Sequence, residues 1–254
     1  MPSPLLDGAP ADRVAAMVAL LQRAAAPEET EIDALCVCLG DASKLVQRRS
    51  AEALAALATR GIPIAPRLRD ALGAADPRRR WGAAYALALI DALPLDALPL
   101  LIDVLGSDDG DLRWAAADLV KRLATDDRAA IVAGLLAAAA VPGRRRKMAL
   151  YSLRDLEVPQ AFDAALAALA DPHLETRLAA LAVLARIHPD PLVAAHRVAS
   201  LIDDADPRMQ RAAAGTLGGL AIRSPEVLLA LRRAEQSGDP SVRRAAARSL
   251  RLLE

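Results

Sequence analysis

Apolar residues recur at helical spacing along the whole chain, in blocks that return at a nearly constant distance. Residues 76–90, DPRRRWGAAYALALI, form one such block. The pair Asp76–Pro77 is typical of a helix start, because the missing amide proton of proline costs little at the first helical position. The apolar residues that follow share one helix face: Ala83, Ala84, Leu87 and Ile90. Similar blocks begin at Asp109, Asp206 and Asp239.

The blocks align on one residue in each, which we call the register position. Its occupants are Gln47, Arg80, Arg113, Arg146, Arg177, Gln210 and Arg243, at spacings of 33, 33, 33, 31, 33 and 33 residues. The residue seven positions later is apolar in every copy, and so is the residue fifteen positions earlier. Each copy is therefore predicted to be a pair of amphipathic helices, and a period of this length is typical of a helical solenoid.

Helix boundaries follow from these spacings and from the prolines near the starts of the first helices. First helices are expected at 28–40, 63–73, 94–106, 127–140, 158–170, 190–204 and 224–236. Second helices are expected at 43–60, 77–91, 109–125, 143–156, 172–188, 207–222 and 240–253. A helix at 11–25 is expected to cap the array. The sequence thus predicts an all-α, right-handed superhelix of seven helix pairs, in one domain over residues 1–254, because no linker interrupts the repeat.

The fourth copy departs from the others at its start. It reads PGRRRK where the other copies have an Asp-Pro or a similar cap, so it lacks the usual helix-start signal. We expect this departure to distort the local stacking or to give the loop at 141–146 a different shape. The basic run 144–147 is unfavourable at a helix start, so either it serves a partner or it forms a solvated loop.

The phrase DP-x-V-R-x-x-A-x-x-x-L can now be compared with known repeats. It is present almost whole in the last copy, at Asp239, Pro240, Val242, Arg243, Ala246 and Leu250. It resembles HEAT repeats of the bacterial bilin-lyase-like type, and the resemblance covers nearly the whole chain. It implies that Asp and Arg of successive repeats form a ladder along the loops. The matching pairs are Asp76 with Arg80, Asp109 with Arg113 and Asp239 with Arg243, with Asp171 and Arg177 as a looser match; Gln47 and Gln210 depart from the pattern.

Composition limits the classes of function. Lysines and arginines number 32 and acidic residues 32, so no global field attracts nucleic acid or an anionic membrane. Cys36 and Cys38 are the only cysteines, and within a helix their thiols point to different sides, so they are expected to be buried and structural. With three scattered histidines they form no zinc set, and no metal or cofactor site is predicted. The first residues do not resemble a secretory signal and no apolar run reaches 18 residues, which indicates a cytoplasmic protein without membrane spans.

One face of the second helices collects the aromatic residues. In such arrays, the positions one, five and eight after the register position line the concave surface; we call them the second-helix face. Every Trp and Tyr of the chain lies there: Trp81, Tyr85, Trp114 and Tyr151. Trp81 and Trp114 are equivalent residues of neighbouring repeats and are expected to stand side by side. The four rings either anchor a partner or pack on one another to fill the face.

The same positions collect basic residues. Eight are basic (Arg48, Lys121, Lys147, Arg154, Arg211, Arg244, Arg248 and Arg251) and two are acidic (Glu52 and Asp118). An acidic peptide, an acidic protein surface or a nucleic-acid backbone would complement this charge. For the three arginines of the last helix, simple solvation of a terminal repeat explains the sequence equally well.

Recognisable catalytic motifs are absent from the sequence: there is no phosphate-binding glycine loop, no H-E-x-x-H and no nucleophile motif. One pair, Trp114 and Asp118, looks like the Trp-x-x-x-Asp arrangement of DNA glycosylases built from HEAT-like repeats. That resemblance implies a carboxylate that stabilises a cationic sugar while an alkylated base leaves. The alternative is that Asp118 pairs with Lys121, Arg122 or Lys147.

These observations favour a non-catalytic scaffold that binds a protein or peptide, in particular an acidic or amphipathic segment, in the groove. The predicted anchors are Trp81, Tyr85, Trp114 and Tyr151, beside Asp118, with charge complementarity from Lys147 and Arg154. A nucleic-acid-binding protein, with or without base excision, is the first alternative. A tetrapyrrole (bilin) lyase or chaperone is the second, suggested by the repeat type and the aromatic residues.

Overall fold

The computed structural model describes residues 3–253, and every regular element in that range is a helix. The chain divides into two compact units, residues 1–101 and residues 102–254. The prediction of one continuous domain over residues 1–254 depends on how the units join and stays a prediction.

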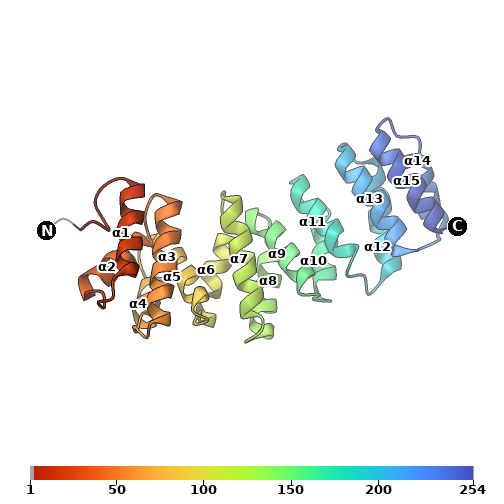
Figure 1. Cartoon of the computed structure of the whole chain (residues 1–254). Coiled ribbons are helices and arrows are strands. Elements are labelled where there is room, and N and C mark those ends of the chain that lie inside the picture. Colours follow the sequence, from red (N-terminus) through yellow and green to blue (C-terminus); the bar gives the residue numbers. More distant parts are fainter. Residues whose placement is uncertain (1–2, 254) are drawn as a thin grey trace. The chain divides into compact units, whose positions relative to one another are not determined.

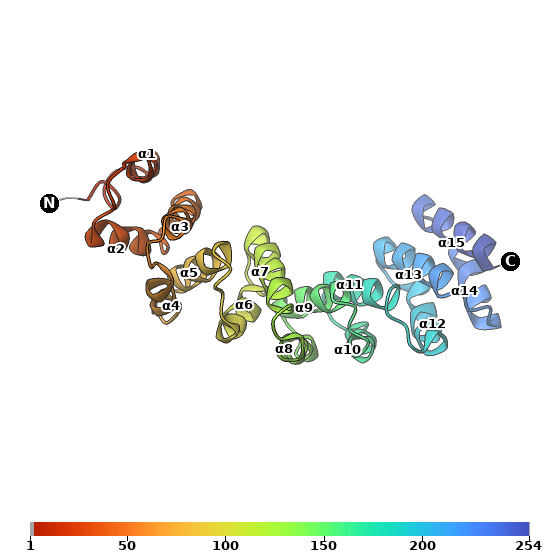
Figure 2. The same cartoon turned by 60° about the horizontal axis from the view of Figure 1, so that its bottom comes forward.

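Unit 1 holds the capping helix and the first repeats. Its helices are α1 (Pro10–Gln22), α2 (Glu29–Cys38), α3 (Lys44–Thr59), α4 (Ala65–Leu72), α5 (Pro77–Leu89) and the 3-10 turn η1 (Leu95–Ala97), which leads into α6 (Leu98–Val104). The helix α1 packs on α3, and α3 packs on α5, while α2 and α4 form the other layer (Figures 1 and 2). This layering is the α-α solenoid arrangement that the periodicity predicts.

Unit 2 continues the same alternation. Its helices are α7 (Gly110–Leu123), α8 (Arg128–Ala140), α9 (Arg144–Asp155), α10 (Ala161–Ala168), α11 (Leu174–Leu184), α12 (Pro191–Ala199) with the 3-10 turn η2 (Ser200–Asp203), α13 (Pro207–Leu220), α14 (Pro225–Ala234) and α15 (Pro240–Leu253). The second helices α7, α9, α11, α13 and α15 pack one on the next. Figure 2 shows them as one layer and α8, α10, α12 and α14 as the other.

The predicted helices are confirmed, with ends that differ by a few residues. Two first helices contain a 3-10 turn where a single α-helix was expected, at η1 and at η2. Both turns are short, as is usual at helix ends. Of the residues predicted to face the core, Ala83, Ala84 and Leu87 are fully buried, and Ile90 is half-buried and packs against the core.

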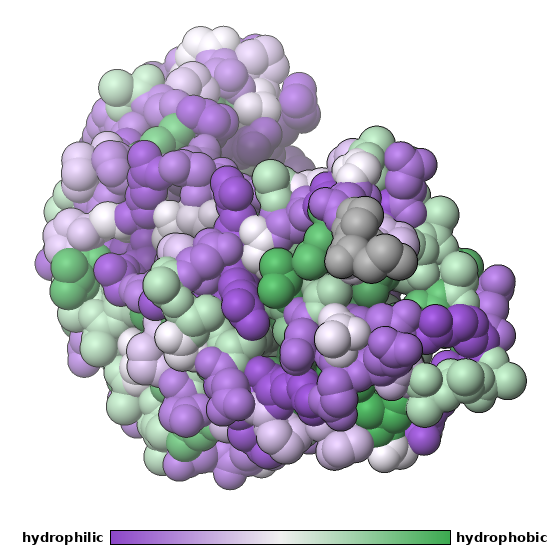
Figure 3. Space-filling view, turned by 90° about the vertical axis from the view of Figure 1, so that its left-hand side faces the viewer, coloured by the Kyte–Doolittle hydropathy of each residue, from purple (hydrophilic) through white to green (hydrophobic). Residues whose placement is uncertain are grey.

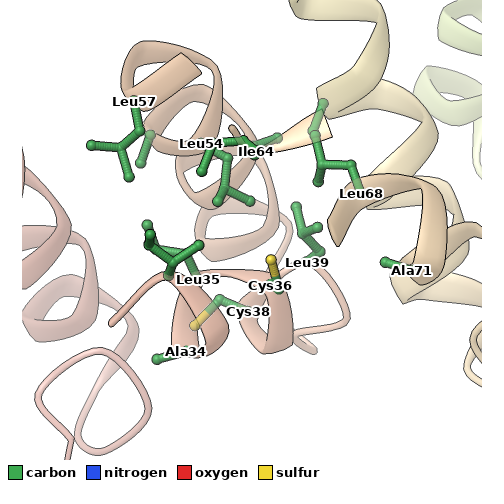
Figure 4. Close-up of a cluster of buried hydrophobic side chains, with 14 of the residues drawn as sticks. Ala34, Leu35, Cys36, Cys38, Leu39, Leu54, Leu57, Ile64, Leu68 and Ala71 are labelled. Atoms are coloured by element: carbon green, nitrogen blue, oxygen red, sulfur yellow. The ribbon is translucent and has the colours of Figure 1, made fainter. Parts of the chain in front are cut away.

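The core of unit 1 lies between its two layers. Leu35, Leu39, Leu54 and Leu68 are fully buried there and converge from three helices and a helix end (Figure 4). On the face in Figure 3, hydrophobic residues appear in small groups between hydrophilic ones. The apolar stripe of each helix is therefore used for packing between the layers.

Both cysteines belong to this core, as predicted. Cys36 and Cys38 are free and buried on α2, and Figure 4 shows their sulfur atoms pointing to different sides. The Cys38 thiol donates to the carbonyl oxygen of Leu5 at 3.1 Å. Burial raises the pKa of each thiol from 9.0 to about 11. Both groups are therefore neutral and poorly reactive at physiological pH.

A recurring hydrogen bond ties each second helix to the loop before it. In five of the seven copies the register side chain donates to the backbone carbonyl six residues earlier; we call this the register bond. The bonds run from Gln47 to Asp41 (2.6 Å), Arg113 to Ser107 (2.7 Å), Arg177 to Asp171 (3.2 Å), Gln210 to Asp204 (2.7 Å) and Arg243 to Ser237 (2.8 Å). Glutamine makes the same bond as arginine, so Gln47 and Gln210 preserve the loop although they depart from the sequence pattern.

Successive repeats are joined by a ladder of Arg–Asp ion pairs. The aspartates of this ladder are not those that the repeat phrase DP-x-V-R suggests. Within unit 2, Arg146 pairs with Asp171 (3.1 Å) and Arg177 with Asp204 (3.2 Å). Within unit 1, Arg13 of the capping helix pairs with Asp41. Each acid precedes the next register position by six residues.

The aspartate four residues before the register position has another role. The Asp76 carboxylate accepts a hydrogen bond from the Arg78 amide, and Asp239 accepts one from the Ser241 amide (2.7 Å). These aspartates are helix N-caps, which explains why they precede proline so regularly. The expectation that Asp76 and Asp239 form rungs of the ladder with Arg80 and Arg243 is therefore wrong: both aspartates cap their own helices.

The fourth copy has the unusual helix start that its sequence predicts. The helix α9 begins after Gly143, which has φ 142° and provides no side-chain cap. Its register residue Arg146 is buried and bonded to Asp171, also buried. Arg146 thus contacts the next repeat as Arg177 does, but without the loop bond that Arg177 also makes.

We expect Gln210→Leu to lower the free energy of unfolding by about 1 kcal/mol, because the Asp204 carbonyl loses its donor. Gln210→Arg should leave stability within about 0.5 kcal/mol of wild type, because arginine makes the register bond elsewhere in the chain. Urea unfolding followed by circular dichroism measures both. Equal destabilisation by the two substitutions would show that the hydrogen bond is not what matters at this position.

The buried thiols should resist modification. At pH 8 the raised pKa values lower the thiolate fraction by about 100-fold relative to an exposed cysteine. Labelling with dithionitrobenzoate should therefore be slow in the folded protein and complete within minutes in denaturant. Rapid labelling of two thiols in the folded protein would contradict the burial of α2.

Candidate functional site

In unit 1 the second-helix face carries a stacked pair of rings. Trp81 and Tyr85 lie one turn apart on α5, with ring centroids 6.3 Å apart and an interplanar angle of 29°. Trp81 is only 8% exposed and Tyr85 is half-buried. Trp81 therefore fills the face and presents little area to a partner.

In unit 2 the rings stack between helices. Trp114 of α7 lies over Tyr151 of α9, with centroids 6.2 Å apart and an interplanar angle of 17°. Trp114 is 58% exposed, so one side of its ring faces solvent although the other is in contact. The Arg154 guanidinium covers the Tyr151 ring at 4.9 Å from its centroid. We call Trp114, Tyr151 and Arg154 the aromatic platform.

Charged groups surround the platform. Burial raises the pKa of the Tyr151 phenol; Arg154 lowers it and Glu175 raises it further, so both charges are close to the ring. Arg154 also bonds to the carboxylate of its neighbour Asp155 (2.7 Å), which neutralises part of its charge. Lys147 is half-buried one turn before Tyr151 and forms no ion pair within residues 3–253.

The other basic residues of the face fall into two groups. Arg48 is neutralised by Glu52, one turn along α3, at 3.0 Å. The rest are exposed and form no ion pair with any described residue: Lys121 on α7, Arg211 on α13, and Arg244, Arg248 and Arg251 on α15. The structure thus leaves a basic stretch on the last two second helices.

Two small residues at positions assigned to the face, Ala88 of α5 and Gly218 of α13, are buried and not part of an open surface. Gly218 of α13 is buried, and a Cβ atom there would lie 2.4 Å from the Ser249 hydroxyl oxygen of α15. The Ser249 hydroxyl donates to the Ala214 carbonyl at 2.8 Å. Glycine is needed here because the two helices approach closely, so the prediction that this position lines the groove is wrong.

Asp118 is exposed on α7, one turn after Trp114, and no ion pair joins it to Lys121 or Lys147. A carboxylate that stabilises a developing cation needs a site that excludes water, and Asp118 does not have one. Within residues 3–253 no three His, Cys, Asp or Glu side chains group as metal ligands. No helix in the same range is long and apolar enough to cross a membrane.

A depression of about 270 Å³ lies at the start of α9, where the loops before α7, α9 and α11 meet. Its lining includes Arg113, Arg144, Lys147, Glu175 and Thr176. The sequence pointed to Arg144 and Lys147 through the basic run 144–147 and to Arg113 as a register residue, but it did not indicate that Glu175 and Thr176 lie beside them. The sequence feature that indicates this depression is the start of the fourth copy, which has no capping side chain.

Trp81 lies in unit 1 and Trp114 in unit 2. The expectation that these two side chains stand side by side therefore stays a prediction. So does the assignment of the four rings to one binding groove. What the structure does establish is that each unit holds one stacked pair and that only the pair in unit 2 has a broadly exposed tryptophan.

Comparison with known proteins concerns the fold. A family model described as HEAT repeats matches residues 32–121 and 194–253. Human deoxyhypusine hydroxylase is 20% identical over 98% of this chain and 93% of its own, with a TM-score of 0.43. The complex of CpcE and CpcF of phycocyanin lyase from Nostoc sp. is 20% identical over 91% of this chain and 96% of that one, with a TM-score of 0.39. An engineered protein is 19% identical over 95% of this chain and 74% of its own, with a TM-score of 0.41.

These solved structures are too distant from this chain to indicate an activity for it. No curated protein sequence matches this chain. The family model covers more than half of the 254 residues, in segments that belong to both units. The chain is a member of the HEAT-repeat family.

Proposed function

We propose that this protein is a non-catalytic scaffold that binds an acidic or amphipathic segment of a partner protein on the second-helix face of unit 2. The observation that supports this function best is the aromatic platform, in which Trp114 is 58% exposed while stacked on Tyr151. A large ring that is held in place and still open to solvent has little conformational entropy to lose on binding.

The charges near the platform favour an acidic partner. Lys147 has no acidic partner among residues 3–253, and Arg154 is shared between Asp155 and the Tyr151 ring. Since the whole chain has no net charge, this attraction acts locally and not over the whole molecule. Apolar contact with Trp114 then supplies affinity, and the basic groups supply orientation.

We expect Trp114→Ala to weaken binding by about 30-fold, as for an interface hot spot of about 2 kcal/mol. The ligand is a peptide selected on the wild-type protein from a random phage-displayed library, and fluorescence anisotropy measures its affinity. Leu229→Ala is the matched control, because Leu229 is 57% exposed but lies on the first helix α14.

Two results would contradict the proposal. One is a selection that yields no binder. The other is a set of binders whose affinity falls as much with Leu229→Ala as with Trp114→Ala. An acidic bias among the selected peptides should accompany a true binding face, and it should weaken in Lys147→Gln.

The exposed arginines of α13 and α15 favour nucleic-acid binding as a second candidate function. Arg211, Arg244, Arg248 and Arg251 form no ion pair with described residues, so their charge is available to phosphate groups. No base-specific contact is implied, because arginine contacts to the backbone carry no sequence information.

For this candidate, the affinity for duplex DNA should fall with salt at a slope of about −3 to −4 on logarithmic axes, as four phosphate contacts require. The triple substitution Arg244→Ala, Arg248→Ala and Arg251→Ala should reduce the slope to about −1. Filter binding between about 50 and 200 mM salt measures both. Absence of binding at the lowest salt would remove nucleic acid from consideration.

A further inference from the structure

The start of α9 combines two features that create a place for an anion: it has no side-chain cap, and its N-cap residue is glycine. Asp76, Asp109, Asp206 and Asp239 each accept a backbone amide of their own helix, whereas Gly143 offers no side-chain acceptor. The second helices α3, α9 and α11 all start without a side-chain cap, and of these three only α9 has glycine at the N-cap. A Cβ atom at Gly143 would meet nothing within 4 Å, so the space beside these amides is open.

Cationic side chains line this space. Arg144 and Lys147 come from α9 and Arg113 from α7. Arg113 is held by its bond to the Ser107 carbonyl and Arg144 by an ion pair with Asp108. The acids at the rim are Asp108 and Glu175, so the three cations exceed the acids by one charge. The depression measures about 270 Å³, several times the roughly 30 Å³ share of one water molecule in the liquid.

An independent observation is the side chain of Thr176. This residue lines the depression from α11 and is only 3% exposed. No residue within 3–253 makes a hydrogen bond to its hydroxyl group. Its oxygen atom is not fully enclosed by protein atoms, so the hydroxyl group is accessible to a ligand in the depression.

The depression lies near the aromatic platform. Lys147 belongs to the depression and lies one helical turn before Tyr151, and Glu175 lines the depression while its charge acts on the Tyr151 phenol. One turn of helix rises about 5.4 Å, which is close to two residues of an extended peptide at about 3.3 Å each. A short peptide can therefore reach both places.

We infer that the depression binds an oxyanion, such as a carboxylate or phosphate group, carried by the partner segment two residues from the apolar side chain that stacks on Trp114. The peptide part of this inference rests on the proposed function. The oxyanion accepts hydrogen bonds from the amides of Arg144 and Arg145, from Lys147 and from the Thr176 hydroxyl, whereas the Arg146 amide donates to the Gly143 carbonyl (3.1 Å). Charge-assisted bonds of this kind are stronger than neutral ones and give directional specificity.

The first experiment uses inorganic phosphate and does not depend on any peptide. Backbone amide resonances of residues 144–147 and 176 should shift saturably on titration, and sodium chloride at equal ionic strength should not reproduce the shift. Lys147→Gln and Thr176→Val should each weaken phosphate binding by about tenfold, which corresponds to one charge-assisted hydrogen bond. Thr176→Ser keeps the hydroxyl and should bind as wild type, and Trp114→Ala should also bind normally. Non-saturable shifts, or equal binding by Thr176→Val and Thr176→Ser, would overturn the site.

The second experiment separates this inference from the proposed function. The peptides are acetyl-Glu-Ala-Trp-amide and acetyl-Gln-Ala-Trp-amide, followed by the same resonances. The wild type should prefer the Glu peptide about tenfold, and Lys147→Gln should remove the preference. Trp114→Ala should weaken both peptides equally. If phosphate binds but neither peptide does, the oxyanion site stands and the scaffold proposal fails. If both peptides bind equally and phosphate does not, the scaffold proposal stands and the oxyanion site is wrong.

Discussion

The register bond fixes the geometry on which the repeat depends. A side chain at the start of each second helix reaches back to a carbonyl six residues earlier, and the same bond recurs from Gln47 to Arg243 with lengths of 2.6 to 3.2 Å. It satisfies a loop carbonyl, and it ties the loop between the two helices of a pair to the start of the second helix. Because only a donor of suitable length is needed, arginine and glutamine are interchangeable there.

The fourth copy shows what happens when that bond is lost. Arg146 turns to Asp171 in the next repeat, and the two side chains are 7% and 1% exposed. Breaking such a pair would leave one charge buried, whereas the intact pair holds α9 against the following loop. At the same place α9 has no side-chain cap, and Gly143, Arg144 and Lys147 line a depression. One local departure from the repeat thus produces both a rigid contact and an accessible depression.

Equivalent tryptophans have different environments for a related reason. Trp81 stacks on Tyr85 one turn later in its own helix and is nearly buried, whereas Trp114 stacks on Tyr151 of the next second helix and keeps more than half of its surface exposed. Ring stacking across two helices makes a flat surface that a ligand can cover. Stacking along one helix fills a gap instead. The candidate site of unit 2 therefore depends on where the second ring of each pair lies in the sequence.

The sequence alone determined the all-α solenoid, the helix pairs and the face that carries Trp114, Tyr151, Lys147 and Arg154, because periodicity and helix-start signals are local properties of the chain. It also predicted an unusual start for the fourth copy. Only the tertiary structure decided that Trp81 is buried, that Gly218 is closed off by Ser249, that Asp171 and Asp204 form the rungs, and that Thr176 lines a depression with Lys147. Exposure and pairing depend on side chains that come together from different repeats, and the position of a residue within its own repeat does not reveal which neighbours it will meet.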